Sequence, residues 1–207
     1  MGLGLSMESL ESPCALGAAD GPSPCLFLVV LGGRTTRAHI ELHDVRFVVG
    51  ERIEDTFDAL RQQWFGARRG LHLDSWMAVR FVDGFRVELR SEPLPEPEPE
   101  PELEPEPAAA AERLWFVNLG GYDPRQLAEQ HQFLLVVAPT PQAARARALR
   151  RGLPEAEGRH KDDLHAVDDC LPLDLLQGWH VQLVADPQGR SQPLVPHWYG
   201  YRRIDRT

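Results

Sequence analysis

The residues best suited to chemistry occur in two matched sets, each holding a Glu-x-His pair and then a His-x-Asp pair. The second set follows the first by 88 positions. Side chains two positions apart in a strand share one face, so each pair can present a carboxylate beside an imidazole. The members are Glu41, His43, His72 and Asp74 in the first set and Glu129, His131, His160 and Asp162 in the second.

Three interpretations of these pairs are open. The favoured one is a local hydrogen-bond network at turns and strand ends, where Asp commonly satisfies backbone amides. A small-molecule or anion site ranks second. A divalent metal ranks last although the residue types suit one, so we predict no metal site and leave any cofactor unknown.

Other polar repeats lie near these pairs. A Gly-Gly pair after a strand permits close approach or positive φ, but phosphate loops need further glycines and an immediate helix start, so we predict structural turns. Neither a Gly-x-Ser-x-Gly elbow nor a cysteine shared by both sets is present, so no nucleophile is predicted. The candidate ligand-binding residues are Gly32, Gly33, Arg37, Glu41, His43, His72, Asp74, Gly120, Gly121, Arg125, Glu129, His131, His160 and Asp162.

An internal duplication positions these residues. From Leu26/Leu114 to Gly50/Ala138, 10 of 25 aligned positions are identical, which is the signature of a repeat. Hydrophobic patterning predicts strands at 25–31, 45–49, 76–82 and 85–89 with a helix at 51–65. In the second copy it predicts strands at 114–119, 133–137, 163–167 and 179–184 with a helix at 141–151, and six inserted residues within 168–177.

These elements predict an α+β fold of two ββαββ repeats. We expect mainly antiparallel sheet, one helix per repeat, and a pseudo-twofold arrangement like that of a fused dimer. The first repeat spans 25–90 and the second 113–186. Residues 1–24 are expected to be disordered, 91–112 to form a Pro/Glu-rich linker, and the aromatic and Arg-rich tail 187–207 to pack on the domain.

Composition excludes several classes of function. The net charge of −9 comes largely from seven glutamates between Glu92 and Glu106, and no basic footprint of a nucleic-acid binder is present. No apolar run approaches the roughly 18 residues of a membrane span. The start of the sequence also has no basic n-region and no clear apolar h-region, so we predict a cytoplasmic location. The three cysteines are widely spaced and odd in number, so we predict reduced thiols.

The motif order resembles a bacterial family called domain of unknown function 1543, in two tandem copies covering most of the chain. The carrying motifs are Leu31-Gly32-Gly33, His43-Asp44, His72-x-Asp74 and the final Gly-aromatic-x-Val strand. The second copy departs at Gln132, where the first has Asp44. The resemblance implies the repeat fold and a soluble bacterial protein, and it implies no activity.

We therefore predict a non-catalytic ligand-binding or assembly module. The alternative is a small-molecule enzyme or metal-dependent hydrolase whose His/Asp/Glu site is formed by the matched motifs of both repeats. The enzyme hypothesis requires His43 and His72 to lie within about 10 Å of each other, because a general base must reach its substrate. We expect a small ligand, a protein partner or a second copy of the chain as binding partners, and neither nucleic acid nor membrane.

Overall fold

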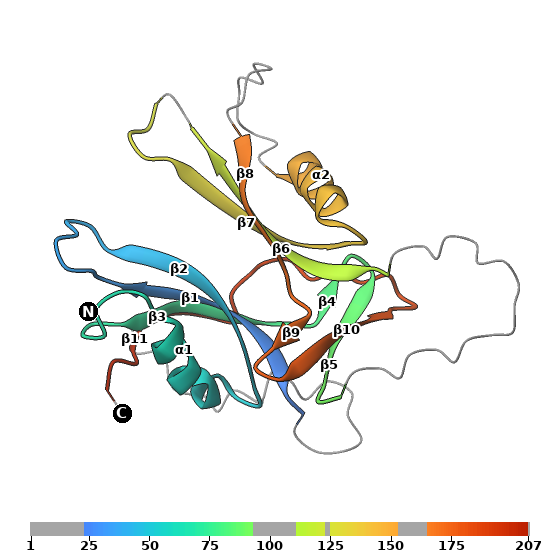
Figure 1. Cartoon of the computed structure of the whole chain (residues 1–207), viewed down its shortest axis with the longest axis horizontal. Coiled ribbons are helices and arrows are strands. Elements are labelled where there is room, and N and C mark those ends of the chain that lie inside the picture. Colours follow the sequence, from blue (N-terminus) through green and yellow to red (C-terminus); the bar gives the residue numbers. More distant parts are fainter. Residues whose placement is uncertain (1–22, 93–110, 123–124, 153–164, 207) are drawn as a thin grey trace, which may run out of the picture. The chain divides into compact units, whose positions relative to one another are not determined.

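A computed structural model describes residues 23–92, 111–122, 125–152 and 165–206. The chain forms two compact units, one of residues 1–80 with 195–207 and one of residues 81–194. We call these unit 1 and unit 2; Figure 1 shows their elements.

Unit 1 contains a four-stranded antiparallel sheet in the order β11-β3-β1-β2. The strands are β1 (Cys25–Gly33), β2 (Leu42–Gly50), β3 (His72–Val79) and β11 (Trp198–Arg203). Between β2 and β3 the chain forms a 3₁₀ turn, η1 (Ile53–Thr56), and a helix, α1 (Phe57–Gln63). The apolar stripe of this segment is buried, since Ile53, Leu60 and Trp64 join the core formed with β1.

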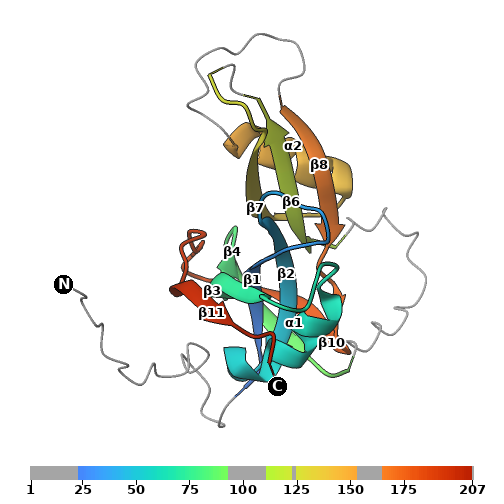
Figure 2. The same cartoon turned by 90° about the vertical axis from the view of Figure 1, so that its left-hand side faces the viewer.

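Unit 2 contains a three-stranded antiparallel sheet in the order β7-β6-β8. Its strands are β6 (Arg113–Gly121), β7 (Gln130–Ala138) and β8 (His165–Pro172). Helix α2 (Pro141–Arg151) lies along all three strands (Figure 2). The helix begins as the sequence predicts, because the Thr140 side chain accepts a hydrogen bond from the Ala143 amide at 3.1 Å and thereby caps the first turn.

A second antiparallel sheet in unit 2 has the order β4-β5-β10-β9. Its strands are β4 (Phe81–Val82), β5 (Phe85–Arg90), β9 (Leu175–Leu176) and β10 (Trp179–Ala185). Positive φ at Asp83 and Gly84, and again at Gln177 and Gly178, makes the tight hairpin turns that link β4 to β5 and β9 to β10.

The α+β class, the antiparallel sheets and the one helix per repeat are confirmed. The predicted strand 76–82 is in fact two strands, β3 and β4, and the second repeat contains the short strand β9, which was not predicted. Each repeat therefore has one strand more than expected. The predicted strand 163–167 instead runs from His165 to Pro172. The pseudo-twofold arrangement remains a prediction.

The compact units do not coincide with the predicted repeats of 25–90 and 113–186. Strand β5 pairs with β10, which places the end of the first repeat in unit 2. Strand β11 pairs with β3, which places the end of the tail in unit 1. The predicted disordered segment and the linker lie almost entirely outside the described residues.

Two further features concern the cysteines and the helices. Cys170 is a free thiol, and Cys14 lies outside the described residues. Among the described residues, no helix is long and apolar enough to span a membrane.

His197 anchors the C-terminal segment to β3. Its amide donates to the Trp76 carbonyl at 2.9 Å, and its Nδ1 accepts from the Ala78 amide at 3.1 Å. Burial, and then the positive charge of Arg80, lower the pKa of His197. The neutral imidazole is therefore the form that the folded protein holds.

This anchor predicts a specific loss of stability in acid. A histidine with a depressed pKa in the folded state contributes stability above its unfolded pKa, about 6.5, and loses it as pH falls. His197→Gln cannot titrate, so its free energy of unfolding should fall less than that of the wild type between pH 7.5 and 5.5, as measured by urea unfolding. His39→Gln, at an exposed loop position, serves as control. Equal pH slopes for His197→Gln and the wild type would contradict the prediction.

Candidate functional site

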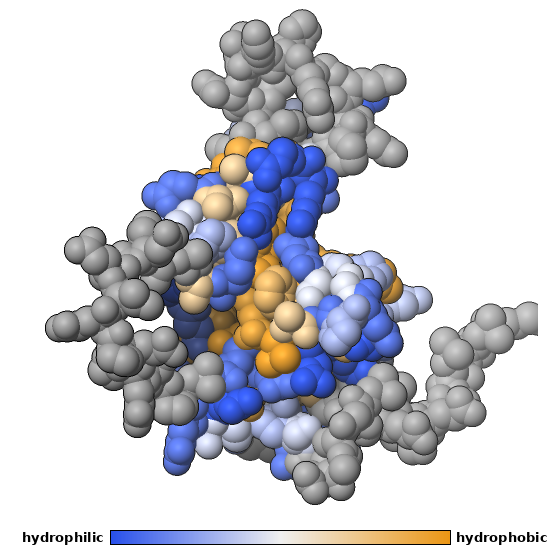
Figure 3. All heavy atoms as spheres, turned by 90° about the vertical axis from the view of Figure 1, so that its right-hand side faces the viewer, coloured by the Kyte–Doolittle hydropathy of each residue, from blue (hydrophilic) through white to orange (hydrophobic). Residues whose placement is uncertain are grey.

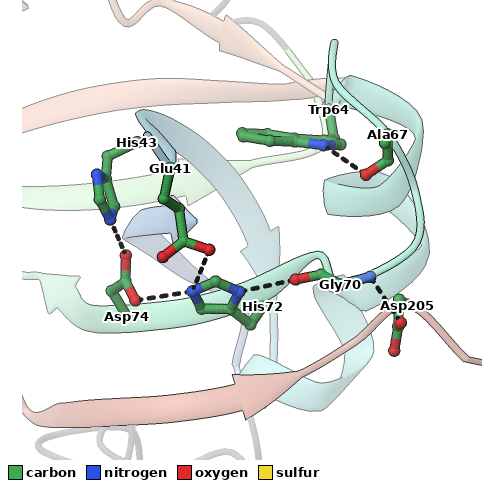
Figure 4. Close-up of polar contacts among 8 residues, drawn as sticks. All are labelled: Glu41, His43, Trp64, Ala67, Gly70, His72, Asp74 and Asp205. Atoms are coloured by element: carbon green, nitrogen blue, oxygen red, sulfur yellow. Dashed lines mark hydrogen bonds and ion pairs between the residues drawn. The ribbon is translucent and has the colours of Figure 1, made fainter. Parts of the chain in front are cut away.

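The four members of the first set, Glu41, His43, His72 and Asp74, meet at one place in unit 1 (Figure 4). Asp74 lies at the centre, with Oδ1 3.2 Å from His72 Nε2 and Oδ2 3.2 Å from His43 Nε2. Glu41 Oε1 approaches the same His72 nitrogen at 3.7 Å. We call these four residues the acidic-histidine cluster.

Gly32 makes room for this cluster. It pairs with His43 of β2 on one side and His72 of β3 on the other. A Cβ at Gly32 would lie 2.4 Å from His72 Nε2 and 2.8 Å from Asp74 Oδ2, so these side chains would have to move to make room for it. The prediction of a turn is wrong, because Gly32 and Gly33 belong to strand β1 and the glycine serves close approach instead.

A β-bulge places Asp74 in the cluster. The pairing of β1 with β3 shifts between Val30/Ser75 and Leu31/Leu73, which leaves Asp74 as the extra residue of β3. Bulges re-aim side chains and are frequent beside functional sites. The bulge explains how His72 and Asp74, two residues apart, contact each other.

His72 is held in one orientation. Its side chain is 1% exposed, and its Nδ1 lies 2.8 Å from the Gly70 carbonyl oxygen. A carbonyl can only accept, so Nδ1 carries a proton and Nε2 faces Asp74 and Glu41. The ring also stacks on Tyr201 of β11, with centroids 4.0 Å apart.

His43 and Asp74 form the accessible part of the cluster. The side chain of His43 is 55% exposed and that of Asp74 29%. Asp74 Oδ2 is buried, and it lies within ion-pair distance of His43 Nε2, at 3.2 Å. A small movement of His43 would thus expose Asp74 Oδ2 as a hydrogen-bond acceptor for a ligand.

The family signature called domain of unknown function (DUF1543) matches residues 38–89 and 126–181. The chain belongs to the DUF1543 family. Its structure is similar to the crystal structure of a protein Il1583 from Idiomarina loihiensis, with 37% sequence identity and a TM-score of 0.63 over 88% of this chain and 99% of that one. No curated protein matches the chain.

The second DUF1543 copy carries a different set of residues at the corresponding place. Gly120 pairs with His131, as Gly32 pairs with His43, but its partner in β8 is Ala166. Strand register therefore matches His72 to Ala166, and it matches Asp74 to Asp168, the extra residue at the shift between Asn118/Asp169 and Leu119/Val167.

This register changes the alignment of the two DUF1543 copies. The corresponding residues of β3 and β8 are 94 positions apart, so the six inserted residues precede β8 instead of lying within 168–177. His160 and Asp162, which the sequence matched to His72 and Asp74, lie outside the described residues. In the described part of the copy, His131 contacts Glu129 at 3.9 Å and Asn118 at 3.4 Å.

The remaining candidates do not join the acidic-histidine cluster. Arg37 is exposed in the loop before β2 and has a φ of 75°, and Arg125 is exposed in the loop before β7. Gly33 instead accommodates the core, because a Cβ there would lie 2.7 Å from Trp64 Cζ2. Asp44, the carboxylate absent at Gln132, pairs with Arg46 at 2.5 Å and so has a local role.

Two residues at the cluster were missed by sequence reasoning. Gly70 and Tyr201 both contact His72, yet neither belongs to a matched pair. Within the described ranges, no group of three or more His, Cys, Asp or Glu side chains is arranged to hold a metal ion.

Proposed function

We propose that the protein is a non-catalytic binding module and that the acidic-histidine cluster of unit 1 is its ligand site. The single observation that carries this proposal is Gly32, whose missing Cβ gives His72 Nε2 and Asp74 Oδ2 the space they occupy. Glycine within a strand costs roughly 0.5–1 kcal/mol relative to alanine. A purely structural network would not need that cost, since Asp and His can hydrogen-bond at strand ends without it.

The charge of the cluster indicates the class of ligand. Glu41 and Asp74 supply two carboxylates beside the imidazoles of His43 and His72. No Lys or Arg contributes to the four. A small ligand that brings hydrogen-bond donors or positive charge would complement these two carboxylates.

Native mass spectrometry of the purified full chain tests this proposal, with His43→Ala as the variant and His131→Ala as the control. The two histidines are similarly exposed, at 55% and 51%, so both variants should fold. We expect an added mass on the wild type and on His131→Ala that is absent from His43→Ala. A chelator wash separates a metal from an organic ligand. A bare wild-type mass, or equal loss from both variants, would contradict the proposal.

A second candidate function is a small-molecule enzyme with His43 as general base. The 3.2 Å contact between Asp74 and His43 Nε2 favours it, because a carboxylate that orients an exposed imidazole is the arrangement of a base and its positioning partner. His43 and His72 share Asp74, so they meet the required proximity. If the protein is an enzyme, the wild type and His131→Ala should consume a component of a small-molecule cell extract, and His43→Ala should not.

A non-catalytic role is also supported by Cys170, the free thiol. Burial raises the pKa of Cys170, which lowers the fraction of reactive thiolate.

A protein partner or a second copy of the chain remains a prediction. On the face shown in Figure 3, apolar side chains gather in a band bordered by hydrophilic ones, and such surfaces are typical of interaction sites. The cytoplasmic location also remains a prediction.

A further inference from the structure

The C-terminal segment 198–205 reaches the acidic-histidine cluster through two residues, Tyr201 and Asp205. We propose that both are positioning residues of the ligand site, and that they fix the orientation of His72. This inference rests on the proposed function, because a ligand site gives the orientation of His72 its role. The contacts that support it are those that hold His72 and Gly70.

Asp205 acts through Gly70. Its Oδ2 accepts the Gly70 amide hydrogen at 2.8 Å, and the Gly70 carbonyl accepts from His72 Nδ1 at 2.8 Å, as Figure 4 shows. Gly70 has a φ of +85° and nothing within 4 Å of where a Cβ would stand. A glycine so little confined needs an external contact to hold its carbonyl in place, and Asp205 supplies one.

Asp205 is itself held as a charged acceptor. Its side chain is 4% exposed, and Arg203 Nε donates to Oδ1 at 3.1 Å. The hydrogen bonds from Arg203, and then from the Gly70 amide, lower the pKa of Asp205 to about 2. The carboxylate therefore remains ionised throughout the neutral range.

Tyr201 acts directly on the imidazole ring. The pairing of β11 with β3 is irregular between Tyr199/Ser75 and Arg202/Leu73, so Gly200 and Tyr201 stand opposite the single residue Asp74. This bulge brings the Tyr201 ring over His72 at a centroid distance of 4.0 Å and an interplanar angle of 34°. Tyr201 thereby restricts movement of the His72 ring from one face, and the Gly70 carbonyl restricts it at Nδ1.

The two repeats differ in the same way. In the described part of unit 2, the sheet β7-β6-β8 has no strand in the place that β11 occupies beside β3, and Ala166 stands where unit 1 has His72. The positioned histidine and the segment that positions it thus occur together in unit 1.

Long-range proton–nitrogen NMR of the histidine rings tests the role of Asp205. We expect wild-type His72 to show a single ring state with hydrogen on Nδ1. Asp205→Ala should lose that single state, and Asp205→Asn, which keeps one acceptor oxygen, should restore part of it. The matched control is Asp186→Ala in unit 2, because Asp186 is also paired with an arginine, Arg190, which lowers its pKa to about 2. An unchanged His72 signal in Asp205→Ala, or an equal change in Asp186→Ala, would overturn the proposal.

Tyr201 provides a second test that does not depend on Asp205. Tyr201→Phe keeps the stacked ring and should preserve the ring shifts of His72, whereas Tyr201→Ala should change them. Identical His72 shifts in both variants would refute the role of Tyr201. Neither readout needs the ligand, so a bare native mass with a positioned His72 would refute the proposed function alone.

Discussion

Replacement of Gly32 by alanine is expected to abolish ligand binding and to destabilise unit 1. The new Cβ would lie 2.4 Å from His72 Nε2 and 2.8 Å from Asp74 Oδ2, so both side chains must move. His72 cannot move freely, because it is 1% exposed and held by Gly70 and Tyr201. Overpacking of this kind costs about 1–3 kcal/mol, offset in part by the ~0.4–1 kcal/mol that alanine gains through the unfolded state.

Urea unfolding and native mass spectrometry measure the two consequences of Gly32→Ala. Gly120→Ala is the matched control, since Gly120 has the same strand register but pairs with Ala166 in place of a histidine. The Gly32 variant should be less stable and should lose the added mass, while the control should keep it. Retention of the added mass by Gly32→Ala would show that the space at Gly32 is not needed for binding.

Ile204→Ala is expected to cost about 2–5 kcal/mol, the range for truncation of a buried isoleucine. Ile204 is 2% exposed and belongs to the core that includes Leu60 and Leu71. Its amide donates to the Leu71 carbonyl at 3.0 Å, and its carbonyl accepts from Arg61 Nε at 2.6 Å. A loss this large so near the end of a chain would show that the C-terminal segment is part of the unit 1 core.

Val195→Ala is the control for Ile204→Ala. Val195 begins the same part of the chain and is 59% exposed, so its truncation should change the free energy of unfolding by less than about 0.5 kcal/mol. Similar effects of the two substitutions in urea unfolding would contradict the burial of Ile204.

Local patterns predicted much of the fold. Helix α2 was predicted at its observed bounds because Thr140-Pro141 is a cap and first-turn pair and Ala144 and Ala148 form one buried side. The Asp83-Gly84 turn was also predicted, since its positive φ values suit this dipeptide. The Glu-x-His and His-x-Asp pairs were found from alternation along a strand, and in unit 1 they do meet.

Long-range pairing accounts for what the sequence did not reveal. The residues of β5 and β11 show no pattern that indicates pairing with β10 and β3, respectively. The division into two compact units was therefore not predicted. Six residues are inserted before β8, so the match of His160 and Asp162 to His72 and Asp74 at an offset of 88 concealed the correspondence of His72 with Ala166. Gly32 was predicted to lie in a turn after a strand. Its two neighbours in the sheet, His43 and His72, are 29 residues apart in sequence, so no local pattern indicated that both would lie beside it.

Ring signals of the assigned histidines provide the most direct test of where the ligand binds. A small-molecule extract of the expression host would be titrated into the nitrogen-labelled full chain, with His43 and His72 observed beside His131. Our proposal predicts saturable shifts of His43 and His72 with His131 unchanged, because among the described residues the glycine, the positioned histidine and the exposed histidine come together in unit 1. Equal shifts of His131, or none at His43 and His72, would contradict a ligand site in unit 1.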